Sequence, residues 1–500
     1  MARMRNPGRK GRKVDYVHLT HPFSPQAVFS DDHVAALHAA ALGVLERDGM
    51  KVLLPEARAL YAAAGARAVD DMVHIGRDIV TAALATAPRG FRLRSVNPAR
   101  ARDYAPGQLL FGPGAGCPNA TDLVRGRRPG TLRDYEETLA LQQSFDVIHI
   151  LGPSVEPQDV PAPVRHLAMM RAQIARADKP MFVYARGRDQ IADSLEMIRL
   201  GLNLSEADWS DGVWADTVIN TNSPRQLDNP MAQGIIDIAR AGQLSIITPF
   251  CLAGAMAPVT VAGALVLQYA EALAGITLAQ LARPRSPVSY GGFSSNVDMK
   301  SGAPAFGTPE HLKMQIGTGQ LARHIGMPWR SGSGAASNTT DMQAAQETTH
   351  TLWGAMLAQA TLVIHAAGWL EGGLSFGYEK FICDIEALQT LAEMCVPPGA
   401  GIEDMALDAL TEVPPGGHFF AAAHTMERYD GAFYAPLVAD LSNHGQWTEG
   451  GALRSDQRAT AIWQRLLANF QPPPHGAEAA VRLAPFIAAR TGQGGATPLD

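Results

Sequence analysis

Cysteine is scarce in this sequence, with four residues in 500 and no C-x-x-C pair. This scarcity excludes a disulfide framework and a zinc ribbon, and it favours the reduced cytoplasm. Cys117 and Cys251 both follow expected strands, so a zinc site shared with a histidine stays a minor alternative.

Positive charge is not in excess either, since the formal net charge is −6. This balance speaks against nucleic-acid binding, which usually leaves a basic footprint. Six basic residues lie within residues 1–13, where we interpret them as a solvated, mobile tail. No apolar run follows them, so they do not form a secretory signal.

No H-E-x-x-H, G-x-S-x-G or P-loop signature is present, and no catalytic residue is assigned. The GPGAG segment at 112–116 lacks the order of a dinucleotide-binding loop, and we interpret it as a strand-end turn. An uncharged stretch at 250–267 is long enough to suggest a membrane span. Pro249 and Pro258 interrupt it, so we expect a strand end, a loop and a buried helix.

What the sequence does contain is an alternation of short apolar runs and helical patterns from about residue 107. Apolar runs separated by helices are typical of parallel strands buried on both faces. The eight units predict a (β/α)8 barrel at 107–397, with a doubly wound open sheet as the alternative. The expected strands are 109–113, 146–151, 179–185, 216–221, 244–249, 287–292, 327–332 and 361–367.

The flanking regions have helical patterns. Residues 1–106 are expected to form an N-terminal helical extension without a strand-rich domain, and residues 398–500 a C-terminal helical tail. Thr131 and Thr308 are expected to cap helices at their N-termini, and Gly326 to end one.

The active site of such a barrel lies at the carboxyl ends of the strands. Aromatic residues, only 7% of the chain, gather after the sixth and eighth strands together with many glycines. Aromatic faces attract quaternary ammonium groups, and glycine lets a bulky ligand approach the backbone. The alternative is that these rings fill the barrel core. His149 and His365 lie within strands and are interpreted as core residues.

Four segments of the chain resemble the trimethylamine:corrinoid methyltransferase family, in particular its branch without pyrrolysine, which includes glycine betaine methyltransferases. They are LLFGPGAGCPNATD (109–122), residues 307–334, residues 341–384 and GHFFAAAHTMERY (417–429). The resemblance implies a TIM barrel and a corrinoid cofactor carried by a separate protein. In pyrrolysine-containing members that residue lies near Gly334, where the loop SGSGAASNTTD here offers no substitute nucleophile or electrophile.

The family reaction implies attack by cob(I)alamin on a methyl carbon. A quaternary ammonium then leaves as a neutral tertiary amine, and no proton is needed, which suits a rim without an obvious acid/base pair. The protein would supply placement and a dry pocket. Trimethylamine would need an activating group that this sequence does not show.

A betaine substrate needs a partner for its carboxylate, and the candidates are Arg330 after the seventh strand and His350 on the following helix. The alternatives are a salt bridge of Arg330 within the barrel wall and a helix-surface position for His350. The expected ammonium cage is Tyr290, Phe293, Trp369 and Phe376, with Glu371 complementing the cation or orienting a loop. Asn220 completes the substrate-binding set. The loops expected to face the cofactor contain Gly332, Gly334, Gly372 and Gly373. No bound metal is expected. The chain is expected to form a homo-oligomer.

Two other functions stay open. One is a barrel lyase or hydrolase that acts on another methylated compound through Glu156 or Glu371. The other is a quaternary-amine sensor or binding protein without catalysis.

Overall fold

A curled eight-stranded sheet forms the centre of the computed structural model, which describes residues 14–499. Seven strands are parallel, and β1 (Leu19–Thr20) pairs antiparallel with β7. The order is β1-β7-β19-β18-β15-β13-β11-β10. The parallel strands are β7 (Gln108–Phe111), β10 (Met181–Phe182), β11 (Ala215–Ile219), β13 (Leu244–Ile247), β15 (Val288–Gly291), β18 (Trp329–Gly332) and β19 (Leu362–Ile364).

Seven of the eight expected strands are therefore confirmed, each shorter than its apolar run. The exception is 146–151, which has no strand assignment. Its backbone nevertheless bonds to both neighbouring segments of the sheet. The His149 amide donates to the Phe111 carbonyl at 2.9 Å, and the Leu151 amide donates to the Pro180 carbonyl at 3.0 Å. The segment thus lies between β7 and β10.

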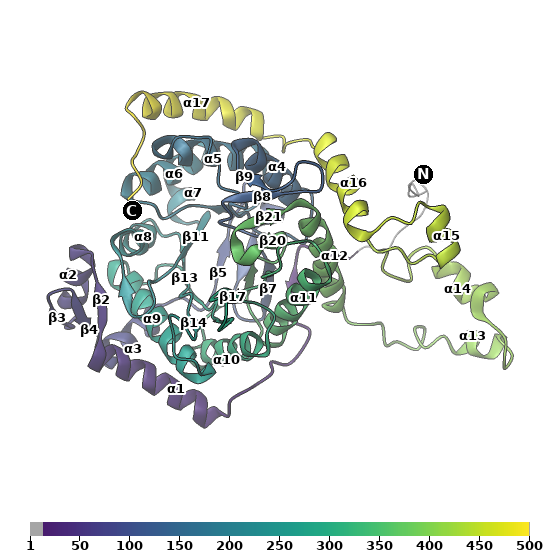
Figure 1. Ribbon diagram of the computed structural model, residues 1–500, viewed down its shortest axis with the longest axis horizontal. Coiled ribbons are helices and arrows are strands. Elements are labelled where there is room, and N and C mark those ends of the chain that lie inside the picture. The colour runs from purple at the N-terminus through teal and green to yellow at the C-terminus, as the bar shows by residue number, and fades with distance from the viewer. Residues whose placement is uncertain (1–13, 500) are drawn as a thin grey trace.

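Helices surround the sheet, as Figure 1 shows. The expected caps are present, because the Thr131 side chain accepts from the Asp134 amide in a capping box and Gly326 ends α10 in the left-handed conformation. The surrounding helices are α4 (Leu132–Gln143), α5 (Ala162–Arg176), α6 (Arg188–Gly201), α7 (Glu206–Ser210), α8 (Asn229–Arg240), α9 (Val261–Ala282), α10 (Pro309–Ile325), α11 (Met342–Leu357) and α12 (Tyr378–Met394).

The uncharged stretch at 250–267 runs into α9, a helix long and apolar enough to cross a membrane by length and composition. Most of this helix is buried, and it packs against α1, α3, α8 and α10. A helix that is apolar on all sides is typical of a position enclosed by other elements. We therefore identify α9 as a core helix, as the prolines indicated.

The N-terminal region contains the expected helices but also short strands that the sequence analysis did not anticipate. Runs of three residues are too short to show the period-2 alternation that identifies a strand. The helices are α1 (Asp31–Gly43), α2 (Pro55–Ala63) and α3 (Arg77–Thr86). The strands are β2 (Met50–Val52), β3 (Arg67–Val69) and β4 (Met72–His74), which form a sheet with β12 (Gln226–Leu227), and the pair β5 (Phe91–Leu93) and β6 (Arg102–Tyr104). The basic segment 1–13 lies outside the described residues.

The pair β5–β6 closes one end of the curled sheet. Leu93 and Tyr104 pack with the inward side chains of the strands, and the Tyr104 hydroxyl donates to Ser289 at 2.8 Å. This inner cluster also contains Leu110, Ile150, Leu244, Ile246, Leu362 and Ile364. The segments that connect strands to helices lie at the opposite end, at the carboxyl termini of the strands.

Two small sheets cover that opposite end. They arise from residues that directly follow the central strands, so the rim is more regular than a set of loops. One contains β20 (Trp369–Leu370), β21 (Ser375–Gly377), β8 (Asn119–Thr121) and β9 (Arg128–Pro129). The other contains β14 (Leu252–Ala253), β16 (Ser295–Val297) and β17 (Pro304–Ala305).

The C-terminal tail is helical, and it divides into a packed and a projecting part. Helix α16 (Ser455–Ala468) packs on α12, and α17 (Gly476–Gly492) packs on α5 and α6. Helices α13 (Leu407–Glu412), α14 (Ala423–Arg428) and α15 (His444–Glu449) extend away from the body, on the right of Figure 1.

Candidate functional site

Five aromatic side chains meet at the carboxyl ends of the strands, around Phe293. Its ring centroid lies 5.3 Å from Phe250, 5.4 Å from Phe306, 5.1 Å from His365 and 5.6 Å from Trp369. We call these five residues the aromatic cluster. Rings at such separations present both faces and edges, and exposed ring faces attract cations.

Arg330 lies directly beside this cluster. It pairs in register with Leu362 of the inner cluster, so its side chain points into the curled sheet. Only 1% of the residue is exposed, and the guanidinium carbon lies 4.9 Å from the Phe293 ring centroid. Nε and Nη1 have no hydrogen-bond partner among residues 14–499. Burial lowers the pKa of Arg330 to about 9.

A buried guanidinium without a counter-ion is costly, because burying an ionic group is favourable only when it is paired and hydrogen-bonded. The arrangement is therefore suited to an anionic ligand group. Arg offers a bidentate fork that matches a carboxylate. The Arg330 side chain thus combines two donor nitrogens that have no hydrogen-bond partner among residues 14–499 with a place next to rings that attract a cation.

His365, interpreted from the sequence as a core residue, belongs to this site. Its backbone φ is +61°, a conformation that non-glycine residues seldom adopt and that is common at functional sites. Its Nδ1 accepts from the Ala115 amide at 3.2 Å, and its ring stacks on Trp369 at 4.5 Å. Burial and the nearby Arg330 hold the pKa of His365 well below its usual range, so the ring is neutral.

The glycines expected to face the cofactor lie beside the rings of the aromatic cluster. A Cβ at Gly332 would lie 2.2 Å from the Phe293 ring, and one at Gly334 would lie 2.0 Å from the Trp369 ring. Gly373 is similarly tight against Trp369 at 2.5 Å, whereas Gly372 meets only Phe306 at 3.9 Å. Three of the four glycines therefore make room for rings of the protein itself, and the prediction that their loops face the cofactor stays a prediction.

Replacing Gly334 with alanine is expected to displace Trp369. The φ of Gly334 is +123°, so the variant suffers backbone strain as well as overlap with the ring. Gly116 is a matched control, because its φ is +77° and nothing lies within 4 Å of an added Cβ. We expect Gly116→Ala to lower the free energy of unfolding by about 1 kcal/mol and Gly334→Ala by about 3 kcal/mol. Equal losses in urea unfolding would show that Trp369 does not restrict this glycine.

Two of the expected cage residues lie apart from the aromatic cluster. Tyr290 pairs in register with Trp329 and points to the outer side of the sheet, where its hydroxyl accepts from Gln268 at 2.7 Å. Phe376 pairs in register with Trp369 between β21 and β20, but its fully buried ring packs against Tyr378 and Phe381. The structure thus brings together Phe293 and Trp369 of the four expected cage residues, and we leave Tyr290 and Phe376 out of the proposed site.

The polar candidates His350, Glu371 and Asn220 lie in three different places. His350 is exposed on α11, where its Nδ1 lies 3.2 Å from the Gly307 carbonyl. Glu371 accepts from Arg127 at 3.0 Å and from Ser375 at 2.7 Å, so it links the loops that carry these residues. Asn220 is exposed at the end of β11, in the same inward-facing phase as Val218.

Glu156 and Glu371 are poor candidates for acid/base chemistry. Glu156 accepts from Arg186 and from Arg165, each at 2.6 Å. The Arg186 and Arg165 guanidinium groups hold the pKa of Glu156 below its usual value despite burial, and Arg127 acts likewise on the pKa of Glu371. Both carboxylates therefore stay ionised and paired at neutral pH.

Asp216 was not singled out in the sequence, although it is the first residue of an expected strand. It pairs in register with Leu244 of the inner cluster, so it faces inward. Both carboxylate oxygens are without a hydrogen-bond partner in the described part of the chain. Burial raises the pKa of Asp216 to about 8, which keeps the group protonated at neutral pH.

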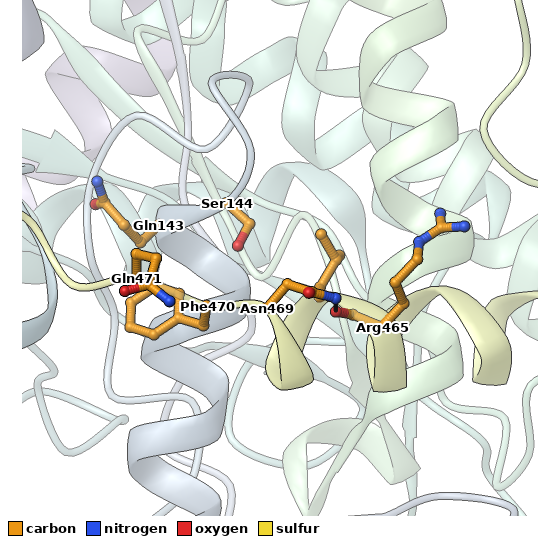
Figure 2. Close-up of a pocket in the computed structure, with 7 residues that line it drawn as sticks. Gln143, Ser144, Arg465, Asn469, Phe470 and Gln471 are labelled. Carbon is orange, nitrogen blue, oxygen red and sulfur yellow. Dashed lines mark hydrogen bonds between the residues drawn. The ribbon is translucent and has the colours of Figure 1, made fainter. Parts of the chain in front are cut away.

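Neither a metal cluster nor the surface pocket beside α4 coincides with this site in the described part of the chain. Within residues 14–499, no group of three or more His, Cys, Asp or Glu side chains is placed to hold a metal ion. Figure 2 shows a pocket of about 430 Å³ at the C-terminal end of α4, lined in part by Gln143, Arg465 and Phe470. Since α4 follows a strand and runs back along the sheet, this pocket lies at the end opposite the aromatic cluster.

Comparisons with known proteins cover nearly the whole chain. A family model described as trimethylamine methyltransferase (MTTB) matches residues 2–495. The glycine betaine methyltransferase of Desulfitobacterium hafniense (strain Y51) is 35% identical over 93% of this chain and 97% of its own. The trimethylamine methyltransferase MttB of Desulfitobacterium hafniense (strain DSM 10664 / DCB-2) is 29% identical over 90% of each chain. The crystal structure of Methanosarcina barkeri monomethylamine methyltransferase aligns with 96% of each chain at 11% identity and a TM-score of 0.46.

Proposed function

Since this chain belongs to the trimethylamine methyltransferase (MTTB) family, we propose that it transfers a methyl group from a quaternary amine to the Co(I) corrinoid of a partner protein. The substrate class we propose is a betaine, in which a quaternary ammonium and a carboxylate are joined. The observation that carries this choice is Arg330, which is buried beside the aromatic cluster and has no counter-ion among residues 14–499. The 35% identity to a glycine betaine methyltransferase supports it.

The two charges of a betaine match the two features of the site. The carboxylate would pair with the guanidinium of Arg330, and the ammonium would lie against the rings of Phe293 and Trp369. Choline has no carboxylate, so its ammonium would be repelled by the like charge of the Arg330 guanidinium. The site therefore favours a zwitterion over a simple cation.

The chemistry of a quaternary amine also suits the protonation states of the site. The bond between the methyl carbon and nitrogen breaks, its electron pair stays on nitrogen, and a neutral tertiary amine leaves. No proton is transferred, so the paired Glu156 and Glu371 and the neutral His365 are not needed as acids or bases. The corrinoid supplies the nucleophile, and this chain's residues bind and orient the methyl donor.

The loops at the carboxyl ends of the strands fit a partner that brings the corrinoid. They carry exposed apolar side chains, and exposed apolar groups around a site are typical of a docking surface. The residues concerned are Leu123, Val124, Val259, Met299, Met342 and Leu374. In a closed (β/α)8 barrel, residues 146–151 would take the eighth strand position, between β7 and β10. The loops that follow the strands would then form one ring.

A methyl-transfer assay with a reduced corrinoid tests the proposal. We expect glycine betaine or a close relative to methylate the corrinoid at a rate at least about 100-fold above choline, a difference of roughly 3 kcal/mol. Trimethylamine is expected to give no transfer. A reaction without protein is the control, and calorimetry of each amine separates binding from turnover. Tight betaine binding without any transfer would instead indicate a binding protein.

A further inference from the structure

The most apolar exposed part of the molecule is the segment 399–433, which we call the arm. It leaves the body after α12, and the chain returns at residues 434–439. There the Tyr434 hydroxyl donates to Gln389 at 3.2 Å, and the Ala439 amide donates to Glu386 at 2.9 Å. The arm is therefore fastened to α12 at its base, while α13 and α14 project beyond it (Figure 1).

Apolar side chains are concentrated on the arm. Of the 23 large apolar side chains exposed among the described residues, nine lie in it, including every exposed aromatic one. Phe420 is 77% exposed and Phe433 is 88% exposed. Patches of this kind on a soluble protein mark interaction surfaces. The nine residues are Ile402, Met405, Leu407, Leu410, Phe419, Phe420, Met426, Tyr429 and Phe433.

The arm is large enough for a stable interface. A buried aromatic side chain contributes about 150–250 Å², so the exposed parts of Phe420, Tyr429 and Phe433 together offer roughly 400 Å². The six remaining apolar side chains bring the total to the order of the ~800 Å² per partner found in stable complexes. The arm also contains 417–429, one of the four segments that carry the family resemblance, although α14 lies far from β20 in Figure 1.

The charge of the arm points to another copy of the same chain. The arm has six acidic residues and one arginine, a net charge of −5 out of −6 for the whole protein. Residues 1–13 have six basic residues and no acidic one. One chain thus contains both an acidic apolar segment and a basic segment of opposite charge. Complementary charges favour and orient association.

From these observations we infer that the arm is an assembly element through which one copy of this chain binds a second copy. The association buries the apolar side chains of α13, α14 and the residues around them against the partner subunit. It is independent of the proposed reaction, since no residue of the aromatic cluster takes part.

The test compares the full-length protein with a double variant, Phe420→Ser and Phe433→Ser, by sedimentation velocity at about 1–100 μM. These side chains are exposed, so the fold is expected to persist, and thermal unfolding checks it. Val481→Ser on α17, which is 74% exposed, is the matched control. We expect the wild type and the control to sediment at twice 53.3 kDa or more, and the double variant to show a dissociation constant at least about 100-fold higher.

Hydrogen exchange distinguishes the partner copy from contacts within one chain. We expect amides of α13 and α14 to exchange slowly at high protein concentration and rapidly at low concentration. A wild type that sediments at 53.3 kDa throughout would overturn the inference. An unchanged mass of the double variant, or protection of the arm that does not depend on concentration, would also overturn it.

Discussion

Arg330→Met is expected to lower kcat/KM for betaine methyl transfer by about 100- to 1,000-fold. The variant removes the guanidinium that pairs with the carboxylate, and loss of such a charged hydrogen-bonded contact costs about 2–4 kcal/mol. Transfer from choline is expected to stay at its low level or to rise, because the like charge beside the ammonium is gone. Parallel assays of both amines measure the difference. An equal loss for both would show that Arg330 acts only through the structure.

The same variant is expected to be more stable than the wild type. Arg330 is buried with two nitrogen atoms that lack partners among residues 14–499, and replacing a buried charge with an apolar side chain of similar volume stabilises by about 1–3 kcal/mol. Arg102 is the matched control, because it is also buried with an unpartnered Nε in the described part of the chain, but its Nη1 donates to the carbonyls of Ala99 and Ala101. We expect Arg102→Met to lower the free energy of unfolding in urea. A loss of stability in both variants would contradict the account of Arg330.

The stability difference between Arg330→Met and the wild type is expected to depend on pH. Burial lowers the pKa of Arg330 in the folded protein to about 9, below its ordinary value of 12.5. The unfolded chain therefore binds the proton more tightly, and stability rises with pH between those two values. The penalty of the buried charge is fully present below about pH 9. The stability difference between Arg330→Met and the wild type should shrink above that pH.

Asp216→Asn is expected to change the stability profile on the acid side. Burial raises the pKa of Asp216 to about 8, whereas the unfolded chain has the ordinary value of 3.8. Between these values the folded state binds more protons, so the wild type loses stability as the pH rises from about 4 to about 8. We expect Asp216→Asn to remove this slope and to be more stable than the wild type by about 2–5 kcal/mol at pH 8.

Asp122→Asn serves as the control for this prediction. Asp122 is also buried, but it accepts from Arg125 and Arg128 at 2.8 Å each, and these guanidinium groups lower its pKa. Removing its charge takes away one of the carboxylates that pair with Arg125 and Arg128, which keep Glu137 and Asp134 respectively, so stability is expected to fall. Urea unfolding at several pH values measures all three proteins. An unchanged slope in Asp216→Asn would show that this carboxyl ionises in the folded protein as easily as in the unfolded chain.

Much of the fold was predictable because local patterns agree with it. Buried parallel strands need continuous apolar runs, and seven of the eight expected runs are strands. Thr131 and Gly326 cap helices for reasons that involve only their neighbours in sequence. The short strands of the N-terminal region were missed, because three residues contain too little pattern to identify a strand.

The candidate site was predictable only in part. Phe293 and Trp369 follow β15 and β19, Arg330 lies within β18, and the three side chains lie together, as expected. Tyr290 follows the same pattern, yet it faces α9, because alternate residues of a strand point to opposite sides. A candidate chosen by its distance from a strand end is therefore assigned to the correct end of the sheet but not always to the correct side.

The amino-acid sequence by itself determined the succession of strands and helices, the caps that bound them and the end of the sheet where the rings gather. These features depend on side-chain periodicity and on backbone groups a few residues apart. Only the tertiary structure decided that Arg330 is buried with no counter-ion in the described part of the chain, that His365 joins the aromatic cluster, and that glycines 332, 334 and 373 accommodate the protein's own rings. Such properties depend on contacts between residues distant in the chain, which form when the strands align in register and the loops close over them.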